Sequence, residues 1–210
     1  MKPEHRHPLR RDRSKDEAWI RSFLNRGAVC VLTTVREGRP HPVPLLYAYD
    51  EDREAVYLHT GKRGRSRENV EVGTSEAAGL AEDGERGGST GPSGLGAPAA
   101  LSVFEMGRLL PAEEAAEFGL EYASVQVSGR STVVDDPGEA QHGLRLLMEK
   151  YAPHLKAGKD YRSITEGEIA RTTVLRVDIE EWSGKEKVEA SDYPAAYLFE
   201  EVRKVGEPGG

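Results

Sequence analysis

Hydrophobic and polar positions alternate with the two-residue period of a β-strand in six segments of the chain. The predicted strands are residues 29–35, 41–49, 55–60, 100–106, 121–134 and 172–179. Short turns, REGRP and DEDR, join the first three, which predicts antiparallel pairing. Pro42 and Pro44 alternate within the second strand and cannot donate to a ladder, so this strand is predicted to be an edge or to face a ligand.

A helical period appears in the segments between these strands. Ser14 and Glu17 have the spacing of a capping box before an apolar face, and Gly27 ends that helix. A short helix is predicted at 111–119 and an amphipathic helix at 138–153, and Thr165 and Glu168 repeat the capping-box spacing. The apolar faces of the first and third helices consist of Trp19, Ile20, Phe23 and Leu24, and of Leu144, Leu147, Met148 and Tyr151.

The order of these elements predicts a mainly β fold with flanking helices, in which six antiparallel strands form a closed or partly closed barrel, because closure removes exposed edges. Residues 1–15 are polar and basic and are predicted to be a flexible arm. Residues 73–100 are rich in Gly, Ser and Ala and are predicted to be a loop or disordered insertion, acting as a lid or as an inert loop. Residues 189–210 form a C-terminal tail.

Composition narrows the possible partners. The chain has 210 residues, a formal net charge of −7 and a pI of about 5.5. This acidic balance argues against nucleic acid as a binding partner. Its single cysteine, Cys30, lies in an apolar run and is predicted to be a buried thiol. No segment resembles a membrane span or a secretory signal, so we expect a soluble, cytoplasmic protein that does not contact a membrane.

One stretch departs from the acidic balance. VYLHTGKRGRSREN, residues 56–69, carries Lys62, Arg63, Arg65 and Arg67 within six positions. Such close cations repel one another unless water or a polyanion such as phosphate lies between them. The stretch is therefore either a solvated turn or a phosphate site, and charge density alone does not decide between the two.

His59 stands at the end of the strand that leads into these cations. Strand alternation places it on the same face as Tyr57, with Val56 and Leu58 on the other face. An imidazole there can donate, accept or transfer a proton near neutral pH. The alternative is a partly buried histidine bonded to a backbone carbonyl.

Five segments in this order resemble the pyridoxamine 5′-phosphate oxidase-related flavin-binding split barrels, and most closely the nitroimidazole-resistance (Nim-like) branch. They are RGAVCVLTT, GRPHPVPLLYAYD, VYLHTGKRGRSREN, EYASVQVSGR and WSGKEK. The resemblance covers residues 16–188 without the Gly-rich insertion. It implies a six-stranded split barrel that forms a homodimer and binds FMN in two clefts at the subunit interface.

The resemblance also implies roles for particular residues. The strand that lies against the flavin ring is matched by Val43, Pro44 and Leu45, and the family histidine that faces the ring or substrate is matched by His59. The turn that receives the phosphate is matched by Thr60, Lys62, Arg65 and Arg67, and in this turn Ser66 replaces a frequent lysine. The C-terminal motif that reaches the partner's cleft is matched by Trp182 and Lys185. Ala123 stands where the Nim-like branch often has an arginine, so one polar contact is expected to be missing. The substrate-phosphate motifs of the true oxidase are not found, so that reaction is not assigned.

Three functions follow from the resemblance. The leading one is an FMN-dependent oxidoreductase that acts on a small molecule, with nitroaromatic reduction as a candidate reaction. In such an enzyme His59 would donate a proton or orient the substrate, and Tyr47 and Tyr122 would be either aromatic walls of the site or packing residues. The second is a flavin- or haem-binding module for storage or sensing, or a haem-degrading barrel, with His59 as axial ligand. The third is a structural dimer with an empty pocket.

Overall fold

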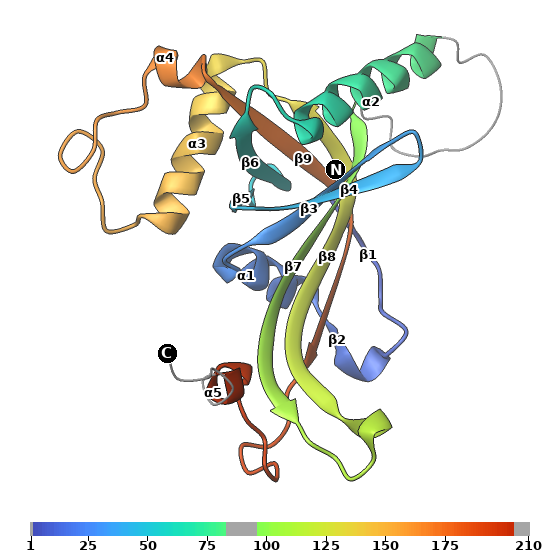
Figure 1. The fold of residues 1–210 in the computed structure, drawn as a ribbon. Helices are drawn as coiled ribbons and strands as arrows, with labels where there is room; N and C mark the ends of the chain where they lie inside the picture. Colours follow the sequence, from blue (N-terminus) through green and yellow to red (C-terminus); the bar gives the residue numbers. More distant parts are fainter. Residues whose placement is uncertain (1, 83–95, 204–210) are drawn as a thin grey trace, which may run out of the picture.

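The computed structural model describes residues 2–82 and 96–203, which form a curved sheet with helices packed around it (Figure 1). Its strands are β1 (Glu4–His5), β2 (Ser14–Lys15), β3 (Cys30–Arg36), β4 (Arg39–Leu45), β5 (Tyr47–Asp50), β6 (Ala55–Gly61), β7 (Ala97–Leu110), β8 (Gly119–Val133) and β9 (Thr172–Lys187). Its helices are η1 (Arg11–Arg13), α1 (Glu17–Arg26), α2 (Arg65–Glu82), η2 (Ala115–Glu117), α3 (Pro137–Tyr151), α4 (Glu166–Ile169) and α5 (Phe199–Arg203). None of these described helices is both long and apolar enough to cross a membrane.

The strands pair in the order β4-β3-β7-β8-β9-β6-β5, with β1 and β2 added to β9. β4 and β5 lie at opposite edges of this order, yet only Leu46 separates them along the chain. A single stretch of chain therefore belongs to both edges, and the sheet curls into a barrel that is split where this stretch passes from one edge to the other. The predicted class, mainly antiparallel β with flanking helices, is confirmed.

The described residues contain nine strands where six were predicted. The predicted strand 41–49 is divided at Leu46, because its first part pairs with β3 and its second part with β6. The other two additional strands, β1 and β2, come from the segment predicted to be a flexible arm, which the structure places along β9.

The edge position predicted for residues 41–45 is confirmed. β4 pairs only with β3 in the strand order, and Pro40, Pro42 and Pro44 lie opposite Val35, Thr33 and Val31. Because proline has no N–H, the outer side of β4 lacks alternate donors. The three prolines are exposed, whereas Val43 and Leu45 are half-buried on the other face.

Helix α1 fills the inside of the barrel. Its N-cap is Asp16, which accepts a hydrogen bond of 2.8 Å from the backbone N–H of Trp19, while the predicted cap Ser14 lies in β2. The predicted face is correct: Ile20, Phe23 and Leu24 are completely buried among inward residues of the sheet. The Cys30 thiol is part of the same core, as predicted, and burial raises its pKa to about 12.

Helix α3 covers the opposite face of β5, β6 and β9. Gly143 permits close packing, since a Cβ there would lie 2.8 Å from Cδ1 of Tyr57. The Tyr57 hydroxyl donates to Glu139 over 2.7 Å, and Arg176 of β9 donates to the same carboxylate over 2.8 Å. Burial alone would raise the pKa of Glu139, but these two hydrogen bonds and the charges of Arg176 and Arg53 together outweigh burial and lower it. The carboxylate thus joins α3 to two strands.

The segment predicted as a 73–100 insertion has a different structure at each end. Residues up to Glu82 continue α2, whose Asn69 and Val70 are buried, and residues from Ala97 onward belong to β7. Residues 83–95 lie outside the described residues, as do 204–210 of the tail. The predicted helix 111–119 is reduced to the single turn η2.

The C-terminal tail is held on the β7–β8 ribbon by Arg108 and Glu121. The Arg108 guanidinium donates to both oxygens of Glu121, over 2.9 and 2.7 Å, and also to the carbonyls of Glu189, Ala190 and Ser191. The backbone N–H of Glu189 donates to Glu121 over 2.8 Å. The hydrogen bonds from Arg108 lower the pKa of Glu121 to about 2.

We expect Glu121→Gln to destabilise the fold at pH 7 by about 1–3 kcal/mol, because Arg108 loses its charged partner. The folded pKa of Glu121 is depressed, so its stabilisation is complete above about pH 5 and is lost as the pH falls toward 2. Urea unfolding at several pH values should show the gap between variant and wild type closing in this range. Glu117→Gln, at an exposed position of η2, is the control, and a gap that does not change with pH would contradict the interpretation.

Candidate functional site

The candidate site lies beside the end of β6, where the chain passes from its pairing with β3, in β4, to its pairing with β6, in β5. β5 pairs with β6 from Asp50 opposite Ala55 to Tyr47 opposite Leu58. If that register continued, Leu45 would lie opposite Thr60, but the chain has by then joined β3. The last residues of β6, His59–Gly61, therefore pair with β9 but not with β4. This divergence leaves backbone groups at the end of β6 for a ligand.

The first turn of α2 follows this divergence directly. Arg65 is the first residue of the helix, and the earliest bond along its axis runs from the Glu68 N–H to the Gly64 carbonyl, over 3.1 Å. The amides of a helix's first turn lack partners within the helix and attract anions. Asn69 fixes this end, since its amide donates to the Thr34 hydroxyl of β3 over 3.0 Å and both side chains are buried.

The predicted phosphate residues occupy different positions around this turn. Arg65 is exposed, whereas Ser66 is only 7% exposed. Arg67 donates from Nη1 to the Lys62 carbonyl over 2.9 Å and from Nε and Nη2 to Glu71 over 2.9 and 2.6 Å. Arg67 is therefore held by α2 and by the turn before it, and Lys62, Arg63 and Arg65 are the more exposed cations.

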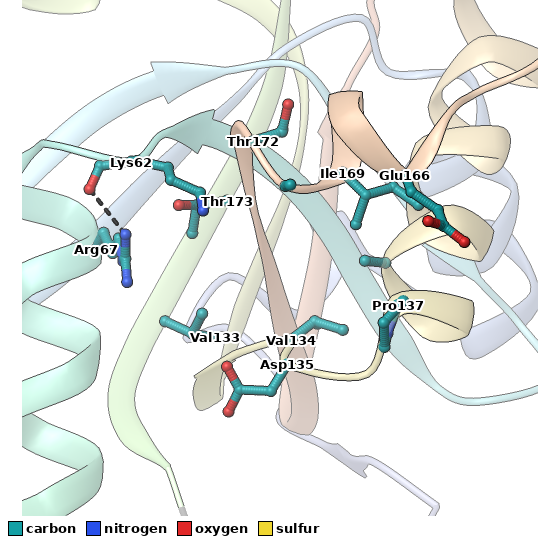
Figure 2. A pocket seen from close by; sticks show the side chains of 12 residues that line it. Lys62, Arg67, Val133, Val134, Asp135, Pro137, Glu166, Ile169, Thr172 and Thr173 are labelled. Carbon is teal, nitrogen blue, oxygen red and sulfur yellow. Dashed lines mark hydrogen bonds between the residues drawn. The ribbon is translucent and has the colours of Figure 1, made fainter.

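A pocket of about 390 Å³ adjoins this turn (Figure 2). Lys62 and Arg67 lie on one side of it and Glu166 of α4 on the other. Its remaining lining residues come from the end of β8, the start of α3, the end of α4 and the start of β9: Val133, Val134, Asp135, Pro137, Ala140, Ile169, Ala170, Thr172 and Thr173. The volume lies in the range of small-molecule sites, and the cationic side matches an anionic group.

His59 and Thr60 lie beside this pocket on β6. His59 pairs with Val174 and Thr60 with Thr173, and Thr173 lines the pocket. The His59 side chain is exposed, on the α3 side of the strand with Tyr57. The structure thus brings together Thr60, Lys62 and Arg67, with His59 next to them.

Trp182 and Lys185 lie far from this group within one chain. Both belong to β9, whose rise of about 3.3 Å per residue puts them roughly 30–40 Å from Thr173. The Trp182 side chain is 1% exposed and packs under the Arg21 guanidinium at 4.7 Å, so it is a core residue of its own chain. Lys185 is half-buried, with Nζ 5.7 Å from the Tyr122 ring.

The two tyrosines considered as aromatic walls have different surroundings. Tyr47 is completely buried and donates from its hydroxyl to the Leu24 carbonyl over 2.7 Å, which makes it a packing residue. Tyr122 is half-buried, and its hydroxyl accepts from Arg13 over 3.4 Å. Ala123, the departure from the Nim-like pattern, is 8% exposed and packs in the core.

Sequence reasoning missed the side of the pocket opposite Lys62. Asp135 and Pro137 lie between the predicted strand 121–134 and the predicted helix 138–153, and in the structure Asp136 caps α3 and Pro137 is its first residue. The capping box at Thr165 and Glu168 was recognised and is present, and it marks the helix that brings Glu166 to the pocket. Within residues 2–82 and 96–203, no three His, Cys, Asp or Glu side chains are grouped as metal ligands.

A protein-family model described as pyridoxamine 5′-phosphate oxidase matches residues 16–85 and 80–186 of the chain. The chain belongs to this family. No curated protein sequence matches it. The family assignment agrees with the five segments on which the resemblance rested, and it includes the whole split barrel from α1 to β9.

Solved structures share the fold at low sequence identity. The flavocytochrome Anf3 from Azotobacter vinelandii aligns over 97% of this chain and 80% of its own, with a TM-score of 0.64 and 17% identity. An FAD and heme binding protein from Mycobacterium smegmatis aligns over 94% and 82%, with 0.61 and 21%. A putative 5-nitroimidazole antibiotic resistance protein from Bacteroides thetaiotaomicron aligns over 82% and 84%, with 0.56 and 18%.

In this member of the pyridoxamine 5′-phosphate oxidase family, we expect Glu71→Gln to tighten anion binding at the first turn of α2. The substitution replaces the charged acceptor of two of the three Arg67 contacts by a neutral amide oxygen and so weakens them, and it removes a nearby negative charge, so inorganic phosphate should bind roughly two- to fivefold more tightly. The amide NMR shifts of residues 65–67 would report it. Glu68→Gln is the control, because it removes a charge without weakening the hydrogen bonds of Arg67. Equal gains in both variants would mean that only the local charge matters and that the Glu71–Arg67 contact does not.

Proposed function

We propose that this chain binds FMN at the first turn of α2 and acts as an FMN-dependent oxidoreductase on a small molecule. The observation that carries the proposal is that Lys62 and Arg67 line a pocket of ligand size beside the first turn of α2, which begins at the exposed Arg65. A phosphate monoester complements both the cations and the amides. A solvated turn would explain the cations but not the pocket next to them.

The residues present fit the cofactor. Thr60, Lys62, Arg65, Arg67 and the backbone amides of Ser66 and Arg67 would hold the phosphate, while the backbone of Val43–Leu45 in β4 would lie along the ring. His59, exposed next to the pocket, would orient the substrate or hold a proton. A bound flavin would supply the electron transfer, and the chain would supply position and charge.

Membership in the pyridoxamine 5′-phosphate oxidase family and the names of similar structures support a flavin. Two of those structures also carry haem or cytochrome in their names, so haem is the alternative cofactor. We favour FMN because a cluster of cations recognises a phosphate directly. The 5-nitroimidazole resistance protein makes nitroaromatic compounds the first substrates to assay.

We also propose that two copies form a homodimer through the outer face of β3 and β7. Their register, continued by one residue from the Cys30–Val103 pair, places Val29 opposite Phe104, and Met106 follows on the same face; these side chains are 44%, 61% and 50% exposed. Apolar groups gathered in this way mark an interaction surface. A second copy would also bring its Lys185 toward a site that the same chain's Lys185 cannot reach.

We expect Phe104→Glu to convert the dimer to monomers, because a carboxylate would be buried at the centre of the interface. The dissociation constant should rise by at least roughly tenfold. Light scattering on size-exclusion fractions at micromolar concentration would measure it. Leu9→Glu, at a fully exposed position away from β3 and β7, is the control. A wild-type protein that is monomeric at this concentration would refute the dimer.

We expect Arg65→Ala to weaken FMN binding by about ten- to a hundredfold, because the arginine makes charge-assisted hydrogen bonds to the phosphate. Riboflavin, which lacks the phosphate, should bind wild type and variant almost equally. His59→Ala should change turnover more than FMN affinity. Flavin fluorescence titrations with both ligands would measure these effects.

Two outcomes would contradict the flavin site. Equal losses of FMN and riboflavin in Arg65→Ala would mean that the arginine only supports the fold. A Soret band in the spectrum of the purified protein, without flavin bands, would identify haem as the cofactor instead.

A further inference from the structure

A second pocket lies between α3 and the loop that follows it. Its volume is about 460 Å³, and it shares no lining residue with the pocket beside Lys62. His142 and Arg145 line it from the helix, and Tyr161 and Ser163 line it from the loop. The proposed flavin site uses none of these side chains.

A buried carboxylate orients His142 from behind. Asp50, at the end of β5, is 7% exposed, and its Oδ2 lies 2.6 Å from His142 Nε2. Asp50 also accepts the backbone N–H of Arg53 over 3.2 Å, and Arg53 Nε lies 3.7 Å from Oδ2. An ionised carboxylate only accepts hydrogen bonds, so the imidazole donates from Nε2.

Arg145 determines the hydrogen-bonding role of the other ring nitrogen, Nδ1. Its Nη2 lies 3.0 Å from His142 Nδ1, and a guanidinium only donates. Nδ1 therefore carries a lone pair, and the ring is the neutral tautomer with hydrogen on Nε2. The Tyr57 ring meets the imidazole edge-on, with centroids 5.6 Å apart, and limits its rotation. The wall of the pocket thus presents an acceptor and a cationic donor side by side.

We propose that this pocket binds inorganic phosphate or a phosphate monoester in its hydrogenphosphate form. Such a ligand offers the complementary pair: its P–OH donates to Nδ1 of His142, and an anionic oxygen accepts from Arg145. The Arg145 side chain is 58% exposed, and among residues 2–82 and 96–203 its only other polar partner is Glu149 of the same helix, at 3.3 Å, so it is able to turn toward a ligand. Sulfate has no O–H at neutral pH and cannot donate to Nδ1.

The experiment follows the His142 ring by NMR of protein labelled with ¹⁵N-histidine, with the resonances assigned from His142→Gln. Without ligand, we expect the pattern of a neutral ring protonated at Nε2. Inorganic phosphate should shift Nδ1 in a saturable way, whereas sulfate at the same ionic strength should not. A phosphate monoester added in a separate titration would show whether the pocket accepts a substituent.

Two variants separate this site from the flavin phosphate site. Arg145→Gln, at an exposed position, should weaken phosphate about ten- to a hundredfold at His142. Arg65→Ala should leave the His142 response unchanged. The proposal would be overturned if phosphate left the ring unchanged, if sulfate shifted it equally, or if Arg145→Gln kept the wild-type affinity.

Discussion

The architecture depends on one stretch of chain that serves both edges of the sheet. Between Leu45 and Tyr47 the chain leaves β3 and joins β6, and this step both closes the barrel and opens the divergence where the candidate site lies. α3 holds the step in place. The Tyr47 N–H donates to the Tyr151 hydroxyl over 3.1 Å, and that hydroxyl donates to the Ala28 carbonyl over 2.8 Å.

Lys150 strengthens the same junction. Its ammonium lies 3.5 Å from the centre of the Tyr47 ring and donates to the Leu24 carbonyl over 3.1 Å. Burial lowers its pKa to about 8. The end of α3 is therefore fixed to α1 and to the strand step at once, while its middle carries His142 and its beginning borders the pocket beside Lys62. Because α3 lines both pockets, this helix sets their positions relative to each other.

The sequence predicted those parts of the fold that have a local cause. Alternation located the strands, and the prolines of β4 identified an edge because a missing N–H has the same effect in any sheet. The sequence could not show that residues 41–49 divide at Leu46, since that break follows from pairing with β6 and not from a local signal. The helical state of residues 73–82 was missed because their small side chains form no apolar face, and the buried residues of α2, Asn69 and Val70, lie about one turn before them.

The sequence likewise predicted some features of the candidate site and missed others. The cations of residues 62–67 were visible as a cluster in the sequence, but their separate roles were not, because Glu71 engages Arg67 one helical turn later. The indole of Trp182 looked available for a neighbour, and only packing shows that Arg21 covers it. Asp50 and His142 are distant in sequence and neither has a motif around it, so their contact could be found only in three dimensions.

The position of β9 has a consequence for how the chain acquires its structure. β9 pairs with β1, β2, β6 and β8, yet it begins at Thr172, more than a hundred residues after β6 ends. Loop-closure entropy makes such distant pairing slow. During synthesis, the hairpins β3–β4 and β5–β6 are free to form early, whereas β1, β2 and the second edge of β6 have no partner until β9 leaves the ribosome. Until β9 is made, one edge of β6 and one edge of β8 therefore stay unpaired, and unpaired strand edges favour association between chains.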